Sequence, residues 1–144
     1  MLRLNFPIYN FKIKNNDNKS YIFDIVRKKY ILNTAEEWVR QNVLNFLVSK
    51  GISKNHIAVE KKINIGKLTK RFDIVVFSSS GSVRLLIECK APNIIVNQKV
   101  FDQTLIYNKN LNAEYMMVTN GLTHYFFSIN SSTKTFNFIK EFPL

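Results

Sequence analysis

Apolar and polar residues alternate along the chain with two different periods, and the period changes several times. Between Thr34 and Gly51 the apolar side chains recur every three or four positions, which predicts a helix. Thr34 and Glu37 fit a capping box at the start of this helix, and Gly51 is a typical helix end. A second helix is predicted over residues 97–111.

Short apolar stretches between polar turns predict strands. The stretches 57–65, 71–77 and 83–90 follow one another with turns around Gly66 and residues 78–82, so they predict an antiparallel meander. A strand at 114–119, after the second helix, would supply a parallel crossover to this meander. Further strands are predicted on either side of a hairpin loop at 14–20 and of a polar turn at 130–133, over 4–13, 21–26, 124–130 and 135–142.

This order of elements predicts an α/β fold. Its central mixed β-sheet would consist of an antiparallel meander plus a parallel crossover strand, flanked by helices. A chain of 144 residues fits one domain with an ordinary hydrophobic core. We expect an N-terminal strand extension over 1–32, a core over 33–122 and a C-terminal strand pair over 123–144.

Composition adds a charge imbalance. The chain has 21 Lys and Arg against 10 Asp and Glu, a net charge of +11, which favours a polyanionic partner, nucleic acid first and an anionic membrane surface second. The single cysteine, Cys89, cannot form an internal disulfide, as expected in a reducing compartment. The sequence shows neither a membrane span nor a signal peptide, so we expect a cytoplasmic protein.

Two of the ten acids stand in apolar strands. Side chains alternate between faces, so Glu88 and Lys90 share one face of their strand and Cys89 takes the other, where it would pack as a small apolar residue. Asp73 lies in the preceding strand. If the serine-rich turn closes a hairpin centred near residue 80, Asp73 falls opposite residues 87–88 and beside the Glu88 carboxylate.

Neighbouring carboxylates repel, and one of them is protonated unless a cation lies between them. Mg²⁺ or Mn²⁺ would suit Asp73 and Glu88, with the backbone carbonyl of Cys89 as a third ligand. Lys90 would then orient a water or stabilise charge on phosphorus. This pattern indicates metal-dependent hydrolysis of phosphodiesters.

The spacing from Asp73 to Glu88-Cys89-Lys90 resembles the signature of the PD-(D/E)XK nuclease superfamily. The wider pattern, over roughly 22–122, resembles the N-terminal nuclease domain of type I restriction enzyme R subunits in a small stand-alone form. The segments that carry this resemblance are TAEEWVRQ (34–41), RFDIVVF (71–77), LLIECKAP (85–92), Gln103 with Tyr107-Asn108, and VTNG (118–121). It implies a restriction-endonuclease-like core, a DNA substrate and a Mg²⁺ or Mn²⁺ cofactor.

The resemblance also implies roles for individual residues. Metal binding and catalysis would fall to Asp73, Glu88 and Lys90, with assistance from Glu36 and Gln103. Between the two glutamates of the helix start, Glu37 has a capping role, whereas Glu36 lies on the stripe that faces the sheet. We expect nucleic-acid contacts at Arg71, Tyr107 and Arg40.

Structural alternatives stay open for most of these residues. Glu88 and Lys90 would also fit an exposed ion pair at a strand end, and Asp73 a pair with Arg71. Gln103 and Tyr107 would fit a surface pair on one helix face. Glu60, beside two lysines, reads as a solvated residue.

The sequence thus favours a Mg²⁺-dependent deoxyribonuclease. The alternative is a catalytically weak or inactive DNA-binding or assembly module that keeps the nuclease fold. A third interpretation is a subunit that depends on a motor or methyltransferase partner, since the sequence shows no ATP-binding motor motif. The oligomeric state is open, and a homodimer is one option.

Overall fold

The computed structural model describes residues 1–108, 111–130, 132–133 and 135–144, with the side chains of Ile65, Tyr107 and Asn108 outside that description. The elements in chain order are β1 (Ile13–Asn16), β2 (Lys19–Asp24), β3 (Lys29–Leu32), α1 (Ala35–Ser49), a short 3-10 helix (Lys54–His56), β4 (Ile57–Ile65), β5 (Leu68–Phe77), β6 (Val83–Cys89), α2 (Gln98–Asn108), β7 (Tyr115–Thr119), β8 (His124–Asn130) and β9 (Thr135–Ile139).

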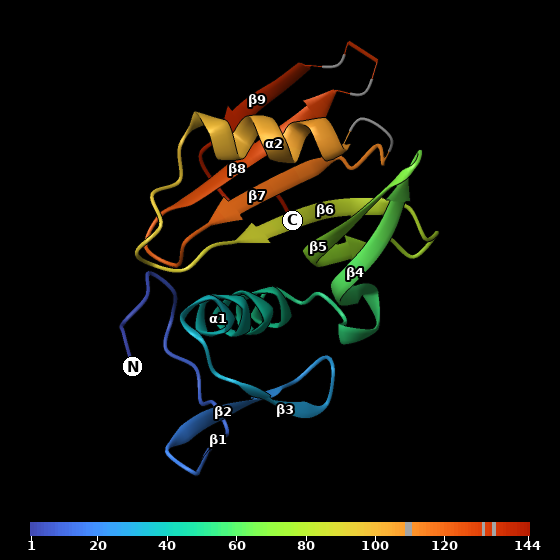
Figure 1. Cartoon of the computed structure of the whole chain (residues 1–144). Coiled ribbons are helices and arrows are strands. Elements are labelled where there is room, and N and C mark those ends of the chain that lie inside the picture. Colours follow the sequence, from blue (N-terminus) through green and yellow to red (C-terminus); the bar gives the residue numbers. More distant parts are fainter. Residues whose placement is uncertain (109–110, 131, 134) are drawn as a thin grey trace.

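The strands form two sheets with α1 between them (Figure 1). The main sheet has the order β4-β5-β6-β7-β8-β9, and the small sheet has the order β1-β2-β3. Within the main sheet β6 and β7 run parallel, whereas the other neighbours are antiparallel. The helix α2 covers the face of the main sheet opposite α1 (Figure 1). The predicted α/β class, with a meander and a parallel crossover, is confirmed.

Helix α1 begins and ends close to where the sequence predicts. The hydroxyl Oγ1 of Thr34 accepts a 3.1 Å hydrogen bond from the backbone N–H of Glu37, and Gly51 follows the helix with φ +90°. In a capping box the Glu37 carboxylate would also accept a hydrogen bond from the backbone N–H of Thr34. That part of the prediction is wrong, because the carboxylate accepts from Arg27 and Gln41 instead. None of the described helices is long and apolar enough to cross a membrane.

The N-terminal part differs most from the sequence prediction. The hairpin of β1 and β2 is confirmed, and its two turn residues, Asp17 and Asn18, both have positive φ. The predicted strand over 4–13 is wrong, since only its last residue belongs to β1. The preceding segment instead docks on the main sheet, where the Asn5 N–H donates to the Gly121 carbonyl at 2.8 Å. Strand β3 was not foreseen.

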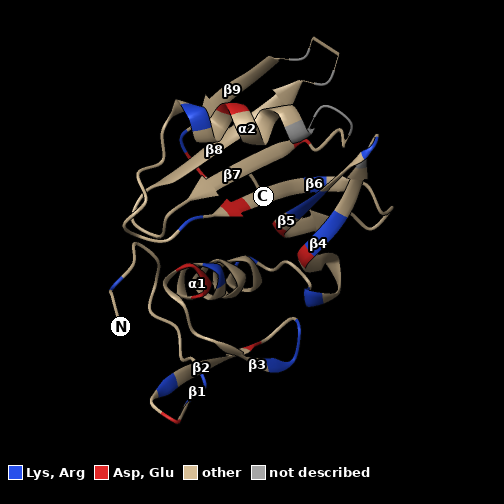
Figure 2. Cartoon of the chain, viewed as in Figure 1, with Lys and Arg blue, Asp and Glu red and all other residues tan. Residues whose placement is uncertain are grey.

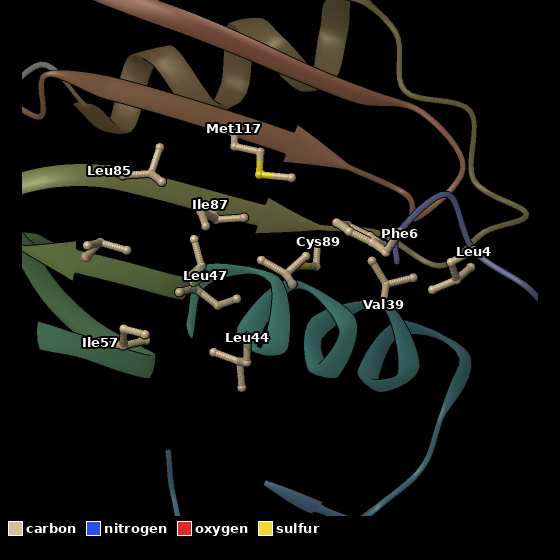
Figure 3. Packing of buried hydrophobic residues seen from close by; sticks show 13 residues of the cluster. Leu4, Phe6, Val39, Leu44, Leu47, Ile57, Leu85, Ile87, Cys89 and Met117 are labelled. Carbon is tan, nitrogen blue, oxygen red and sulfur yellow. The ribbon is translucent and has the colours of Figure 1, made fainter. Parts of the chain in front are cut away.

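Two hydrophobic layers hold the main sheet between its helices. On the α1 side, Val39 and Leu47 pack on the strands, as Figure 3 shows. On the α2 side, Phe101 packs with Phe127 and other aromatic residues. Strand β6 serves both layers by alternation: Leu85, Ile87 and Cys89 face α1, whereas Leu86 faces α2.

Candidate functional site

The first feature of the site is the opposition of two carboxylates on neighbouring strands. In the antiparallel pair of β5 and β6, Ile74 lies opposite Ile87. Continued by one residue, this register places Asp73 opposite Glu88, and the charge of Asp73 acts on the Glu88 carboxyl group. The turn-centred pairing deduced from the sequence therefore agrees with the register of the sheet.

Both oxygens of Asp73 accept hydrogen bonds. Its Oδ1 accepts from Nη2 of Arg40 at 2.7 Å, and its Oδ2 accepts from the backbone N–H of Cys89 at 2.8 Å. The first bond comes from α1 and the second from the end of β6, so the carboxylate is fixed between three elements. Arg71, considered as a partner from the sequence, is exposed on β5.

Glu88 is buried with one oxygen unsatisfied. The residue is 7% exposed, and among the described residues no hydrogen bond reaches its Oε1. The ammonium of Lys70 lies 4.0 Å from this oxygen. Burial, together with the charge of Asp73, raises the pKa of Glu88 to about 8. Such a carboxyl group is poised to gain from a cation that enters the space in front of it.

That space is a small cavity of about 130 Å³ on the α2 side of the sheet. Its walls include Glu88 and Lys90 from the end of β6 and Gln103 from α2, together with Lys70, Val100 and Thr104. Three of the site residues expected from the sequence thus line one cavity. The exposed strand-end ion pair does not describe Glu88, which is buried.

Glu36 joins the site from the first turn of α1. Its side chain is 45% exposed, and Oε1 accepts from Nη2 of Arg40 at 3.2 Å. Burial and the charge of Asp73 raise the pKa of Glu36, whereas the charges of Arg40 and Lys90 oppose this rise. Glu36 therefore lies within electrostatic reach of both Asp73 and Lys90.

A network of ion pairs contacts these acids on the α1 side of the site, and the sequence analysis did not predict it. Nη1 of Arg40 lies 2.9 Å from Glu37 Oε1, and Nη2 of Arg27 lies 3.0 Å from the same oxygen. Arg27 also contacts Asp24 at 2.7 Å and Glu60 at 3.1 Å. Two guanidinium groups thus hold together carboxylates from β2, α1, β4 and β5.

The network changes how Arg40 and Glu60 are interpreted. The Arg40 side chain is 7% exposed and directed toward carboxylates rather than toward solvent, where a DNA phosphate would approach. Burial opposes its charge, but the bond to Asp73 and the charge of Glu37 raise the pKa of Arg40. Glu60, expected to be solvated, is 38% exposed and also accepts a hydrogen bond from Arg27, with φ +53° at its backbone.

A sequence signal existed for only part of this network. Arg40 follows Glu36 and Glu37 by four and three residues, so their contacts follow from helical spacing. Arg27 lies in the loop between β2 and β3, and its contacts with Glu37 and Glu60 join separate elements. No local sequence pattern predicts ion pairs between such distant residues.

The remaining expected residues have simpler positions. Cys89 is 1% exposed and packs in the α1-side core, and burial raises the pKa of its thiol. Tyr107 belongs to α2, but its side chain lies outside the described part of the structure. Over the described ranges, no three Asp, Glu, His or Cys side chains are grouped as a metal cluster. The site offers an opposed pair of carboxylates.

A comparison with known proteins identifies the family of the chain. The family model of the type I restriction enzyme R protein N terminus (HSDR_N) matches residues 35–143, which include α1, the main sheet and α2. No curated protein matches the chain. Because the family match covers most of its length, the chain belongs to the family of type I restriction enzyme R protein N termini.

Proposed function

We propose that the chain is a metal-dependent deoxyribonuclease of the PD-(D/E)XK kind that hydrolyses DNA phosphodiester bonds. The observation that carries the proposal is the buried carboxyl group of Glu88 on the cavity wall, whose Oε1 accepts no hydrogen bond from the described residues and which feels the charge of Asp73. The Lys70 ammonium lies 4.0 Å from this oxygen, beyond hydrogen-bond distance, so a cation bound in the cavity would supply the closer contact that a buried carboxylate needs.

The donor set fits a hard divalent ion such as Mg²⁺ or Mn²⁺. Asp73 and Glu88 would hold it, with the backbone carbonyl of Cys89 as a further oxygen ligand. When bound, such an ion supplies Lewis acidity to a phosphodiester. The Oδ1 bond to Arg40 leaves the remaining lone pairs of the Asp73 carboxylate available to a second partner.

The other residues of the cavity would act on the substrate itself. Lys90, at the cavity wall, would stabilise negative charge that develops on the phosphate oxygens or orient the attacking water. Gln103 would donate a hydrogen bond to the same phosphate from α2. Glu36, the most exposed acid near Lys90, would accept a proton from the water.

A calorimetric titration with Mg²⁺ and with Mn²⁺ tests the metal site before any substrate is known. We expect binding to the wild type and loss of binding in Asp73→Asn, which keeps the shape of the side chain. Glu114→Gln, a change at an exposed acid away from the cavity, is the matched control and should bind as the wild type. Equal titrations of all three proteins would contradict the metal site.

Activity is tested on plasmid, linear, single-stranded and branched DNA with either metal. We expect cleavage by the wild type and a loss of at least about 100-fold in Lys90→Ala, the scale of an electrostatic catalytic group. If no substrate is cleaved, or if Lys90→Ala cleaves as the wild type does, the enzymatic proposal fails.

A second candidate function is a DNA-binding or assembly module with little or no catalysis. It is favoured by Arg40, whose guanidinium already partly neutralises Asp73 at 2.7 Å. DNA binding that weakens with salt, survives EDTA and persists in Asp73→Ala would support it. Co-purification with a motor or methyltransferase subunit would indicate a partner-dependent role, and the mass in solution would test for a homodimer.

A further inference from the structure

The outer face of the small sheet carries side chains that the candidate site does not use. Along β2 the buried residues Ile22 and Asp24 face α1, where Asp24 accepts a hydrogen bond from Gln41. Tyr21 and Phe23 therefore lie on the opposite face of the strand. Cross-strand pairing places Tyr30 of β3 beside Phe23 on that face.

Lysines surround these rings. The ammonium of Lys14 lies 4.3 Å from the ring centroid of Tyr30, and that of Lys12 lies 5.4 Å from the ring centroid of Phe23. Lys14 is also the cross-strand partner of Tyr21. We call this surface the aromatic–lysine face, and it consists of Lys12, Lys14, Lys19, Tyr21, Phe23 and Tyr30.

The charge of this part of the chain is one-sided. Residues 10–32 contain six Lys and Arg and only two acids. Of the acids, Asp24 is fully buried and paired with Arg27, so Asp17 in the hairpin turn is the exposed one. Figure 2 shows Lys and Arg on the small sheet and in its turns, on the side of α1 away from the main sheet.

The positive surface continues into a groove. A cavity of about 390 Å³ adjoins the face and includes Lys12 and Phe23 in its walls. Two further lysines, Lys28 and Lys54, line the same groove together with Asn10 and Asn45. One exposed ring, Tyr30, and two partly buried rings, Tyr21 and Phe23, thus adjoin a positively charged groove. This combination is typical of proteins that bind single-stranded nucleic acid.

We propose that the aromatic–lysine face binds single-stranded DNA. Bases would stack on Tyr21, Phe23 and Tyr30, and phosphates would contact the lysines. Residues two apart on a strand are separated by about 7 Å, so each ring of β2 can receive a different base of an extended strand. Duplex bases are already stacked on one another and would not gain these contacts.

The face lies before residue 35, outside the family match. Stacking and phosphate contacts here need neither Asp73 nor Glu88. Only the choice of DNA over RNA rests on the proposed function. A failure of the nuclease proposal and a failure of this one are therefore distinguishable when binding is measured without divalent metal.

The experiment is a fluorescence-anisotropy titration of the full chain with a labelled oligothymidine of about 15 nucleotides in EDTA. The same length of duplex DNA and an oligouridine are run in parallel. We expect tighter binding to the single-stranded DNA than to either, and the same binding in Asp73→Asn. If the chain binds the single-stranded DNA but cleaves no DNA, the proposed nuclease function fails and this inference still holds.

Variants separate stacking from charge. Tyr30→Ala should weaken binding at least about fivefold, whereas Tyr30→Phe keeps the ring and should stay within about twofold. The slope of the logarithm of the binding constant against the logarithm of the salt concentration should become shallower by about 0.7 in Lys14→Gln. It should not change in Lys140→Gln, a substitution at an exposed lysine next to β9.

Three results would overturn the inference: equal affinity for duplex and single strand, equal loss in the Ala and Phe variants of Tyr30, or tighter binding to the oligouridine. Thermal unfolding followed by circular dichroism shows whether each variant folds. If Tyr30→Ala does not fold, Tyr21→Ala against Tyr21→Phe gives the same comparison on the neighbouring strand.

Discussion

Arg40 and Asp73 stand 33 positions apart in the chain and are joined by a 2.7 Å hydrogen bond from guanidinium to carboxylate. The pair links α1 to β5 at the point where β5 lies opposite Glu88. The acid that we propose as a metal ligand is therefore held in place by a buried cation. This arrangement fixes the carboxylate and limits its negative charge.

Replacing Arg40 should cost more stability than its helix position suggests. Arg40→Ala leaves Asp73 without its guanidinium partner and leaves Glu37 with Arg27 as its remaining cation. Breaking a buried pair costs about 3 to 5 kcal/mol. Arg40→Lys keeps the charge but loses the two-pronged geometry, so a smaller loss is expected. Urea unfolding measures the free energy of unfolding of both variants, with Arg71→Ala at an exposed position as the control. Similar losses of this free energy in Arg40→Ala and Arg71→Ala would contradict the role of Arg40.

The neighbours Glu36 and Glu37 should separate function from stability. Glu37→Gln removes the charge that Arg27 and Arg40 share, at a cost of about 3 kcal/mol in the free energy of unfolding. Glu36→Gln should cost less than about 1 kcal/mol, because this side chain is 45% exposed. In a DNA-cleavage assay Glu36→Gln should lose activity while remaining folded. The prediction fails if the two substitutions destabilise the protein equally.

Two glycines provide a matched test of packing. Gly121 and Gly81 have nearly the same φ, +85° and +89°, but a Cβ at Gly121 would lie 2.9 Å from Leu4 whereas none of the described atoms lies within 4 Å at Gly81. Gly81→Ala should cost about 1 kcal/mol of backbone strain. Gly121→Ala should cost about 1 to 3 kcal/mol more, because Leu4 and Val39 must shift. Equal melting temperatures would contradict the packing of the N-terminal segment.

His124 should contribute a loss of stability in mild acid. Nε2 of His124 donates to the Asn5 carbonyl at 2.7 Å, and Nδ1 accepts from the Thr119 hydroxyl at 2.7 Å. Burial lowers the pKa of His124, although the bond to Asn5 opposes this. The unfolded chain therefore binds a proton at a higher pH than the folded one does. Stability is full above the ordinary histidine pKa of about 6.5 and is lost as pH falls below it.

The loss through His124 has an upper limit of about 1.4 kcal/mol per pH unit. Urea unfolding between pH 5 and 8 measures it. The raised pKa of Glu88 gives stability the opposite pH dependence in this window, so the test is the difference between the wild type and His124→Gln, which keeps an amide donor and an amide acceptor and should remove the acid loss due to His124. An unchanged slope in the variant would assign the acid sensitivity to other groups.

Local patterns explain why much of the main sheet could be predicted. The alternation of β6 places Glu88 on the face opposite Cys89. The serine-rich turn brings Asp73 opposite residues 87–88, and a register shift between Val76 and Phe77 then favours Glu88 over Ile87. Both inferences use neighbours in sequence or one short hairpin. The position of Gln103 follows from the crossover, which brings α2 over the end of β6.

The errors arise where distant elements meet. The capping pattern gave Glu37 a local partner, but Arg27 and Arg40 compete for its carboxylate with stronger, charged hydrogen bonds. The segment before β1 has the composition of a strand, yet Leu4 and Phe6 gain more by filling the core above α1 than by pairing. Such choices depend on tertiary contacts, which no short window of sequence contains.

Contacts from the loop between β2 and β3 cross the N-terminal boundary of the family match at residue 35. Arg27 lies on one side of this boundary, and its partners Glu37 and Glu60 lie on the other. A protein truncated to begin at residue 35 would keep the matched region but lose the Thr34 cap, the Asn5 hydrogen bond to Gly121, and Arg27, one of the two cations that contact Glu37. The stretch shared with the family is therefore shorter than the stretch that must be expressed for α1 to sit correctly.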